Sequence, residues 1–278
     1  MTVKKKRIIV LAVVAVIFLS LIIWTAWGNT ALELNTYTIS SDRLPVAFDG
    51  YRIAHVSDLH NTTIGKGNSR LLKAIRDSSP DIIVITGDLI DSRRTNINVA
   101  FSFVREAADI APVLYVSGNH EARLDYASIR QGLQDSGAIV LDNDQFVLEK
   151  GEESLSFLGL SDMKFSSVED MTTELTRLVR ETEGYRILLC HRPQLFDIFR
   201  GSGIHLMLSG HAHGGQVRIP FVGGSFTLDQ GLFPKYDSGL YGSENCRMLV
   251  SRGLGDSIIS LRVANRHTLL VIDLYASD

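Results

Sequence analysis

Five apolar segments of this chain each end in a short cluster of polar residues, and this repeated arrangement limits the possible folds more than any other feature. The clusters are HVSDLH at residues 55–60, ITGDLID at 85–91, VSGNHE at 116–121, LLCHRP at 188–193 and LSGHAHGG at 208–215. Helical periodicity separates the first three, in SRLLKAIRDSS and NVAFSFVREAAD. The alternation predicts an α/β fold, in which polar groups at the carboxyl ends of parallel strands converge on one ligand site.

The second half of the chain is richer in apolar segments of strand length, namely QFVLEK, SLSFLGL, YRILLC, IHLMLSG, CRMLVS and TLLVID. It contains no internal repeat, low-complexity segment or composition break, so we predict a single domain over residues 50–278. The formal net charge of the chain is −3. This charge argues against a surface that grips nucleic acid, and we expect no nucleic-acid partner.

A continuous apolar segment, IIVLAVVAVIFLSLIIWTAW, occupies residues 8–27. A helix of that length spans about 30 Å, which is the thickness of the hydrocarbon core of a bilayer. The cluster KKKR precedes it, and the next basic residue is Arg43. The positive-inside rule therefore places the basic tip, residues 1–7, in the cytoplasm and the residues after Gly28 outside.

We predict that residues 8–27 are an uncleaved signal anchor, a single transmembrane helix with Trp24 and Trp27 at the membrane interface, and that residues 28–49 are a linker with one strand, LNTYTI. The alternatives are a cleaved signal peptide and a buried helix of a soluble protein. The apolar segment is longer than the usual 7–15 residues of a signal peptide, and Ala26-Trp27-Gly28 is a poor cleavage site.

The residue types in the polar clusters suit a pair of metal ions. Carboxylates, imidazoles and a side-chain amide are ligands for Mn, Fe, Zn or Mg, whereas a thiolate site would need cysteines. Asp58 and His60 are two residues apart, so their side chains share a face if strand geometry continues through Leu59. Candidate ligands directly follow three glycines, each of which would allow a sharp turn at a strand end. These glycines are Gly87, Gly118 and Gly210.

Taken in order, the clusters also match a known pattern of five blocks. The blocks are Asp58-x-His60, Gly87-Asp88-x-x-Asp91, Gly118-Asn119-His120-Glu121, His191 and Gly210-His211-x-His213. In order and spacing they resemble the signature blocks of the calcineurin-like metallophosphoesterases. The strings GHAHGGQVRIP, GLFPKYDSGLY and SRGLG resemble the membrane-associated bacterial branch of that family. The resemblance implies an α/β/β/α sandwich of two mixed sheets flanked by helices.

The resemblance also implies a dinuclear metal centre. One divalent ion would be held by Asp58, His60 and His213. A second would be held by Asn119, His191 and His211, with Asp88 bridging. A hydroxide between the ions would attack phosphorus in line. His120 would stabilise phosphoryl charge or protonate the leaving oxygen, oriented by Asp91.

Several residues near the blocks need separate interpretation. We expect Asn119, Arg252 and Gly214 to contact the substrate, because Arg offers a fork for phosphate oxygens and Gly lets the backbone approach. Gly214 would alternatively supply only a turn. Glu121 is interpreted as a residue outside the ligand set, and the histidines outside the blocks as ordinary core or surface residues. These are His55, His205 and His267. A disulfide between Cys190 and Cys246 is disfavoured.

The expected function is hydrolysis of a phosphodiester or pyrophosphate, from a lipid-linked or cell-envelope substrate, by a membrane-anchored enzyme. The first alternative is a pyrophosphatase acting on UDP-2,3-diacylglucosamine at the cytoplasmic side. The second is a catalytically inactive, membrane-tethered binding module that keeps the fold. A protein phosphatase is a third, with no specific feature in its favour.

Overall fold

The structure is a computed structural model of the full chain, in which residues 2–256 and 262–277 are described. The helices are α1 at Val3–Gly28, α2 at Ser69–Asp77, α3 at Ile97–Ala108, α4 at Tyr126–Asp135, α5 at Val168–Arg180 and α6 at Phe196–Phe199. Single 3₁₀ turns lie at Val46–Phe48, Lys66–Asn68, Glu121–Arg123, Pro193–Leu195 and His213–Gly215.

The strands form two large sheets and two small hairpins. The first sheet has the order β1-β16-β2-β3-β4-β5, with β1 at Leu32–Ser41, β2 at Tyr51–Val56, β3 at Ile82–Thr86, β4 at Val113–Val116, β5 at Ala138–Val140 and β16 at His267–Ala276. The second has the order β14-β15-β9-β8-β7-β6, with β6 at Asp144–Lys150, β7 at Glu153–Gly159, β8 at Tyr185–Leu189, β9 at Leu206–Ser209, β14 at Gly239–Ser243 and β15 at Cys246–Val250. The hairpins pair β10, Arg218–Ile219, with β11, Gly223–Gly224, and β12, Phe226–Thr227, with β13, Gly231–Leu232.

Both sheets are mixed. In the first, β2, β3, β4 and β5 are parallel to one another and β16 is antiparallel to β2. In the second, β7, β8, β9 and β15 are parallel and the outer strands β6 and β14 are antiparallel. The apolar segments expected as strands form β2, β3, β4, β6, β7, β8, β9, β15 and β16, so this part of the prediction is confirmed.

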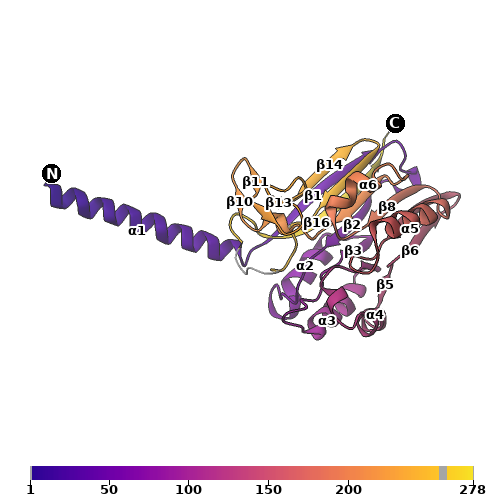
Figure 1. The fold of residues 1–278 in the computed structure, drawn as a ribbon, viewed down its shortest axis with the longest axis horizontal. Coiled ribbons are helices and arrows are strands. Elements are labelled where there is room, and N and C mark those ends of the chain that lie inside the picture. Colours follow the sequence, from indigo (N-terminus) through magenta and orange to yellow (C-terminus); the bar gives the residue numbers. More distant parts are fainter. Residues whose placement is uncertain (1, 257–261, 278) are drawn as a thin grey trace.

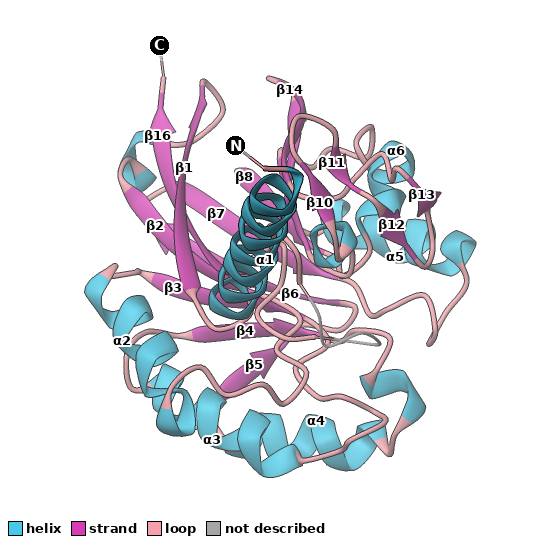
Figure 2. Cartoon of the chain, turned by 90° about the vertical axis from the view of Figure 1, so that its left-hand side faces the viewer, coloured by secondary structure: helices cyan, strands magenta, loops and turns pink. Residues whose placement is uncertain are grey.

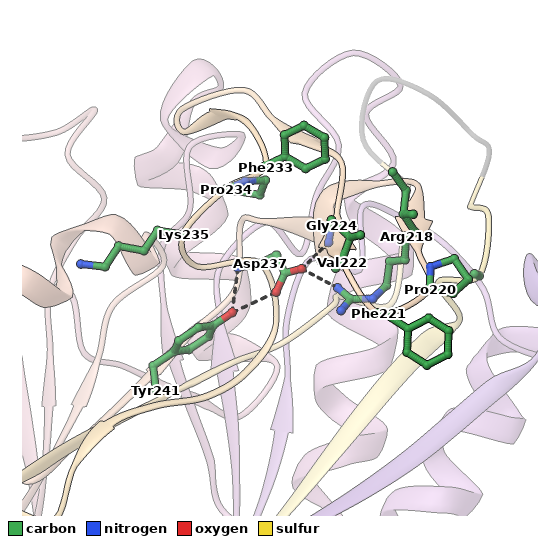
Figure 3. A pocket seen from close by; sticks show the side chains of 13 residues that line it. Arg218, Pro220, Phe221, Val222, Gly224, Phe233, Pro234, Lys235, Asp237 and Tyr241 are labelled. Carbon is green, nitrogen blue, oxygen red and sulfur yellow. Dashed lines mark hydrogen bonds and ion pairs between the residues drawn. The ribbon is translucent and has the colours of Figure 1, made fainter.

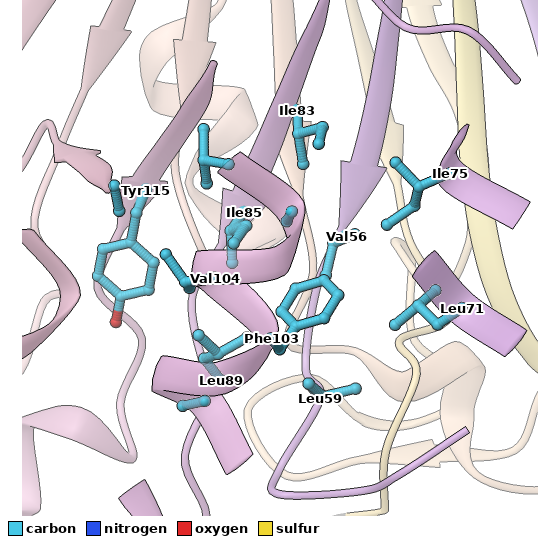
Figure 4. Close-up of a cluster of buried hydrophobic side chains, with 14 of the residues drawn as sticks. Val56, Leu59, Leu71, Ile75, Ile83, Ile85, Leu89, Phe103, Val104 and Tyr115 are labelled. Atoms are coloured by element: carbon cyan, nitrogen blue, oxygen red, sulfur yellow. The ribbon is translucent and has the colours of Figure 1, made fainter. Parts of the chain in front are cut away.

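Three apolar cores hold the layers together. One lies between the sheets, where Ile53 and Val84 of the first sheet belong to the same cluster as Phe157 and Leu208 of the second. A second packs α2, α3 and α4 against the outer face of the first sheet, and Figure 4 shows Leu71, Ile75 and Phe103 facing the strands there. The third packs α5 and α6 against the second sheet. The layer order is therefore α/β/β/α, as expected (Figures 1 and 2).

The segment expected to be a linker contains the expected strand, but that strand is longer than LNTYTI and belongs to the first sheet, which corrects the linker prediction. β1 pairs in parallel with β16 from Leu32 opposite His267 to Ser41 opposite Ala276. The strand lies at the edge of the sheet, and along it half-buried or buried side chains such as Tyr37 and Ile39 alternate with exposed ones. Because an edge strand needs apolar residues on one face only, its polar sequence is compatible with a sheet position.

The N-terminal apolar segment forms α1, which extends away from the rest of the molecule (Figure 1). Its large apolar side chains are exposed, among them Ile8, Val14 and Phe18. Within the described residues, no helix combines the length and hydropathy needed to cross a membrane, so the predicted transmembrane character of this segment is not confirmed. The interfacial role expected of Trp24 and Trp27 concerns side chains that lie outside the described residues.

Candidate metal centre

The polar clusters meet at one edge of the two-sheet sandwich. Those after β2, β3 and β4 come from the first sheet, and those after β8 and β9 come from the second. Because these strands are parallel within each sheet, their carboxyl ends lie on the same side and deliver the clusters to one place. The expected convergence of segments far apart in the sequence is therefore present.

Asp58, His60 and His213 form the first group. His60 Nε2 lies 3.1 Å from His213 Nε2 and 3.9 Å from Asp58 Oδ1. His213 Nε2 lies 3.4 Å from the same carboxylate oxygen. All three residues are buried, and their ligand atoms lie within 4.8 Å of one another. This group could hold a metal ion.

Asp88, His191 and His211 form a second group of the same kind. His191 Nε2 lies 3.4 Å from Asp88 Oδ2, 3.1 Å from His211 Nδ1 and 3.3 Å from the Asn119 amide oxygen. Asp88 Oδ2 is also 3.6 Å from His60 Nε2 of the first group. Asp88 thus lies between the two groups, at the position that a bridging ligand requires.

The backbone at this site adopts a conformation that side-chain-bearing residues rarely take. Five of the six residues in the two groups have a positive φ angle, which is +53° at Asp58, +47° at His60, +50° at Asp88, +65° at His211 and +48° at His213. Left-handed residues other than Gly are uncommon and cluster at functional sites. The condition of continued strand geometry through Leu59 is not met, and a sharp turn after β2 brings Asp58 and His60 together instead.

Gly118 and Gly210 are needed for close approach rather than for turning. A Cβ on Gly210 would overlap Ser57 Oγ and Asp58 Oδ2, and a Cβ on Gly118 would overlap Asp88 Oδ1. Of the three glycines that precede candidate ligands, only Gly87 has a positive φ, of +82°. Two carboxylates of the site therefore occupy space that a side chain at these glycines would fill.

Burial and mutual charge set the ionisation of the site. Burial lowers the pKa of His60 to about 3 and, together with the charge of Arg262, holds the pKa of His213 well below its usual value. Burial also disfavours the charged form of His191, but the Asp88 carboxylate outweighs burial and raises the pKa of His191 to about 10. Burial likewise disfavours the charged form of Asp88, but His191 holds the pKa of Asp88 well below its usual value. His60 and His213 are therefore neutral imidazoles with lone pairs to offer a cation.

Outer contacts orient two of the histidines. His191 Nδ1 lies 2.7 Å from the carbonyl oxygen of Thr86, and His211 Nε2 lies 2.7 Å from Asp229 Oδ2. Such bonds fix the ring tautomer and leave the other nitrogen of each ring for a metal. The sequence analysis missed Asp229, which follows β12 in a turn and belongs to no block.

Glu121 organises the loops around the site through hydrogen bonds to their backbone. It is fully buried, and its carboxylate accepts hydrogen bonds of 3.0 Å from the backbone N–H groups of Asp88, Ile90 and Gly118. Burial and the charge of Asp88 raise the pKa of Glu121 to about 8. The structure thus places Glu121 outside the two ligand groups, where it ties the loops after β3 and β4 together.

His120 lies beside these groups, with its ring centroid 4.5 Å from that of His60. Asp91 Oδ1 is 3.4 Å from His120 Nδ1, and the backbone N–H of Ser92 donates to the same nitrogen at 3.1 Å. With His60, the two residues form a third group that could hold a metal ion. Burial and the charges of Arg123 and Arg93 outweigh the two nearby carboxylates, and the pKa of His120 is lowered.

A cavity of about 290 Å³ opens onto both groups. Its polar wall includes Asp88, Asn119 and His120, and Arg93 and Arg123 also line it. The opposite wall is partly apolar and comes from the β12 hairpin. The residues contributed by that hairpin are Phe226, Thr227 and Leu228. Both cationic side chains were missed by the sequence analysis.

Arg252 and Gly214, expected at the substrate, do not line this cavity. The Arg252 guanidinium lies 3.5 Å from Glu33 Oε2, in a separate cavity near the end of α1. Gly214 has a φ of +61°, and a Cβ there would collide with the Asn265 side chain. The structure therefore favours the turn interpretation of Gly214, and it directs Arg252 toward β1.

The remaining histidines and the cysteines lie outside the site. His55 Nε2 is 2.8 Å from Thr86 Oγ1, His205 Nδ1 accepts a hydrogen bond from the backbone N–H of Arg186, and His267 Nε2 is 2.7 Å from the carbonyl oxygen of Asn29. Cys190 and Cys246 are both buried and free, which agrees with the expectation that they form no disulfide.

The fold and the site can be compared with those of known proteins. The family model described as calcineurin-like phosphoesterase matches residues 51–215, and the chain belongs to this family. It is a metal-dependent phosphoesterase.

Named relatives agree with this assignment. The chain is 28% identical over 258 residues to the uncharacterized metallophosphoesterase YkuE of Bacillus subtilis (strain 168), covering 89% of this chain and 87% of YkuE. It is 26% identical over 202 residues to the phosphodiesterase YaeI of Escherichia coli (strain K12), covering 71% and 72%. The crystal structure of TT1561 of Thermus thermophilus shares the fold, with a TM-score of 0.51, 11% identity and coverage of 73% of this chain and 90% of TT1561.

Proposed function

We propose that the chain is a membrane-anchored enzyme that uses two divalent metal ions to hydrolyse a phosphodiester or pyrophosphate of a lipid-linked or cell-envelope substrate. The convergence of buried acceptor atoms carries the metal part of this proposal. His60 and His213, both with lowered pKa, face each other through nitrogens 3.1 Å apart, and Asp58 Oδ1 and Asp88 Oδ2 lie within 3.9 Å of His60 Nε2. These imidazole nitrogens and carboxylate oxygens together offer more lone pairs than the neutral rings have N–H groups to satisfy, and a divalent cation would satisfy them.

The donor set fits two ions. Asp58, His60 and His213 would hold one. Asn119, His191 and His211 would hold the other, with Asp88 shared. Imidazole, carboxylate and amide donors suit Mn, Fe or Zn, and Mg is compatible with the oxygens. Ions of this kind supply Lewis-acid stabilisation of phosphoryl oxygens and lower the pKa of a nucleophilic water.

His120 and Asp91 are the proposed catalytic pair of the protein itself. Because the Ser92 N–H donates to Nδ1, the neutral His120 ring carries its proton on Nε2, and that N–H can donate to a phosphoryl or leaving oxygen. Asp91 Oδ1 also accepts from Arg93 at the backbone, 2.9 Å, and at Nε, 3.3 Å. Asp91 thus positions an arginine that lines the cavity, and its carboxylate, 3.4 Å from His120 Nδ1, would stabilise the ring when His120 takes up a proton.

The cavity wall favours a substrate with a charged centre and an apolar substituent. Arg93 and Arg123 supply positive charge for phosphate oxygens, whereas Phe226 and Leu228 offer an apolar surface to the neighbouring group. Asn119 reaches the same cavity and would contact the substrate as well as a metal. A lipid-linked or aromatic phosphoester combines these two features.

Membrane anchoring through α1 is supported by the pattern of its surface. Exposed apolar side chains run along its length, and among the described residues it packs against none of the layers of the fold (Figure 1). A helix that is apolar all round requires burial in protein or in lipid. With KKKR at its start, we propose that the catalytic domain lies outside the cytoplasm.

Topology separates this proposal from the UDP-2,3-diacylglucosamine alternative, which needs the domain in the cytoplasm. Protease added to intact cells should degrade the chain after Gly28, and full protection would restore the cytoplasmic alternative. The inactive binding module is disfavoured because each of the five clusters delivers its side chains to the site.

Activity should be tested on purified full-length chain with Mn²⁺. We expect hydrolysis of bis-p-nitrophenyl phosphate, loss of that hydrolysis in Asp58→Asn, and retention in Asp77→Asn, where an exposed ion pair on α2 is changed in the same way. Metal-loaded wild-type chain that hydrolyses neither phosphodiesters nor phosphomonoesters would support the inactive module instead.

A further inference from the structure

An exposed apolar surface lies on the two hairpins between β10 and β13. We call it the hairpin surface. It consists of Ile219, Phe221, Val222, Leu228, Leu232 and Phe233. Phe221 is 109% exposed, Leu232 73% and Phe233 60%. Single exposed apolar residues are ordinary, but a group this dense within residues 219–233 marks an interaction surface.

The hairpin surface is held in place by a polar contact beneath it. Asp237 is buried and accepts hydrogen bonds from Arg218 at 2.9 Å, from the Tyr241 hydroxyl at 2.9 Å and from the backbone N–H of Gly224. Figure 3 shows these bonds, with Phe221 and Phe233 projecting from two different loops around them. These hydrogen bonds thus hold in place the backbone that carries the exposed side chains.

The hairpins lie where α1 meets the domain. Arg218 N–H donates to the carbonyl oxygen of Val263 at 2.9 Å. The neighbouring Arg262 exchanges two hydrogen bonds with Asn29, which directly follows α1. Ala264 lines both the cavity between the hairpins and the cavity at Gly28. Figures 1 and 2 show β10 and β11 at the end of the domain from which α1 extends.

The same hairpins form a wall of the catalytic cavity. Phe226 of β12 pairs with Leu232 of β13. Phe226 and the nearby Leu228 line the catalytic cavity, whereas Leu232 is exposed to solvent. One short hairpin therefore connects an exposed apolar surface to the metal centre.

We propose that the hairpin surface docks onto a lipid bilayer and opens the catalytic cavity toward phosphoesters held in that bilayer. A bilayer is favoured as the occupant because α1, an apolar helix, ends beside the surface, so whatever receives α1 is adjacent to the hairpins. Charge is balanced around this surface. Asp229, the single acidic residue between residues 217 and 235, is engaged by His211, and the flanking Arg218 and Lys235 pair with Asp237 and Asp197, so no unpaired acidic group opposes contact with a bilayer there. The substrate part of this inference rests on the proposed phosphoesterase function, whereas the docking part rests only on the proposed anchoring by α1.

Docking is tested on the full chain reconstituted into vesicles of phosphatidylethanolamine and phosphatidylglycerol. A nitrobenzoxadiazole label is placed at Phe221→Cys, since Cys190 and Cys246 are buried. Val46→Cys is the matched control, because Val46 is 75% exposed and lies in the turn after β1, at the opposite end of the sheet from α1. Spin-labelled lipid should quench the label at 221 and leave the label at 46 unaffected. Equal quenching at both sites, or a blue shift at 221 without quenching, would overturn docking, the latter by indicating a second copy of the chain.

The substrate part is tested with a double variant, Phe221→Ser with Leu232→Ser, neither of which lines the catalytic cavity. Hydrolysis of a diacylglycerol p-nitrophenyl phosphodiester in the same vesicles should fall by about tenfold or more, while hydrolysis of soluble bis-p-nitrophenyl phosphate stays within about twofold. Equal loss on both substrates, or no loss on either, would overturn it. A wild-type chain inactive on both would refute the proposed function, and the quenching result would still decide docking.

Discussion

Replacement of Asp229 by Asn isolates the contribution of a residue that belongs to no sequence block. Asp229 Oδ2 lies 2.7 Å from His211 Nε2 and accepts from Gln194 at 3.1 Å, and it also contacts the Arg192 guanidinium. The bond from His211 holds the pKa of Asp229 well below its usual value, so the group is a carboxylate at neutral pH. Asn keeps the shape and removes the charge.

The size of the effect follows from that contact. A hydrogen bond to a carboxylate contributes about 1.5–3 kcal/mol and a neutral one about 1 kcal/mol. Asp229→Asn should therefore weaken the interaction that orients His211 by about 1–2 kcal/mol. Asp229 is partly exposed, and screening places the value toward the lower limit. Since about 1.4 kcal/mol is a factor of ten, affinity for one of the two metal ions should fall about tenfold.

The assay is competition of full-length chain with a chelator of known metal affinity. Asp197→Asn is the matched control, because Asp197 forms an exposed ion pair with Lys235 at 2.6 Å. The thermal unfolding midpoint of the metal-free variant should match the wild type, since Arg192 keeps its buried partner Asp162 at 2.7 Å. Unchanged affinity for both ions in Asp229→Asn would refute the proposed role of His211 as a metal ligand held by Asp229.

Three further predictions test other parts of the site and fold. Asp88→Asn should abolish turnover and weaken both metal positions by elemental analysis, because one carboxylate lies between the two groups; normal turnover would contradict the bridging role. His120→Ala should keep both metals and lose about 10²–10³ in kcat, and loss of a metal would instead make His120 a ligand. Burial lowers the pKa of His55 to about 4, so the folded state favours the neutral ring. The resulting contribution to the free energy of unfolding, about 3 kcal/mol, is fully present above pH 6.5 and is lost as pH falls toward 4. Denaturant unfolding of metal-free His55→Gln between pH 7 and 5 should show a shallower loss of stability than the wild type, and identical pH slopes would contradict this account.

The parallel strands are predictable because burial on both faces makes them continuous apolar runs. β3 is buried along its length, and the continuous apolar segment within DIIVIT predicts a strand. The edge strand β1 gives a weaker signal, because its burial is one-sided and its polar sequence is equally typical of a linker. LNTYTI predicts the middle of β1 but not its full length or its pairing with β16. The helix α5 also carries a readable signal, since Ser167 and Asp170 form a capping box before apolar residues at helical spacing.

The residues of the candidate site also differ in how well the sequence predicts their positions. Asp58, Asp88 and His191 could be predicted because each follows a strand directly, and the strand fixes its position. Asp229 and Arg123 could not be predicted, because they reach the site from long connections whose path depends on packing between distant segments. Arg252 shows the limit of a motif, since SRGLG resembles a string of the bacterial branch while the Arg252 guanidinium lies 3.5 Å from Glu33; its contact with substrate stays a prediction.

The most direct test of the central claim is the metal content of purified, active full-length chain, measured together with turnover during stepwise chelation and reloading with Mn²⁺. The geometry of the two groups around Asp88 predicts two ions per chain, loss of phosphodiester hydrolysis when they are removed, and recovery when both return. Full hydrolysis by chain that carries no metal, or one ion per chain at full activity, would contradict the dinuclear assignment.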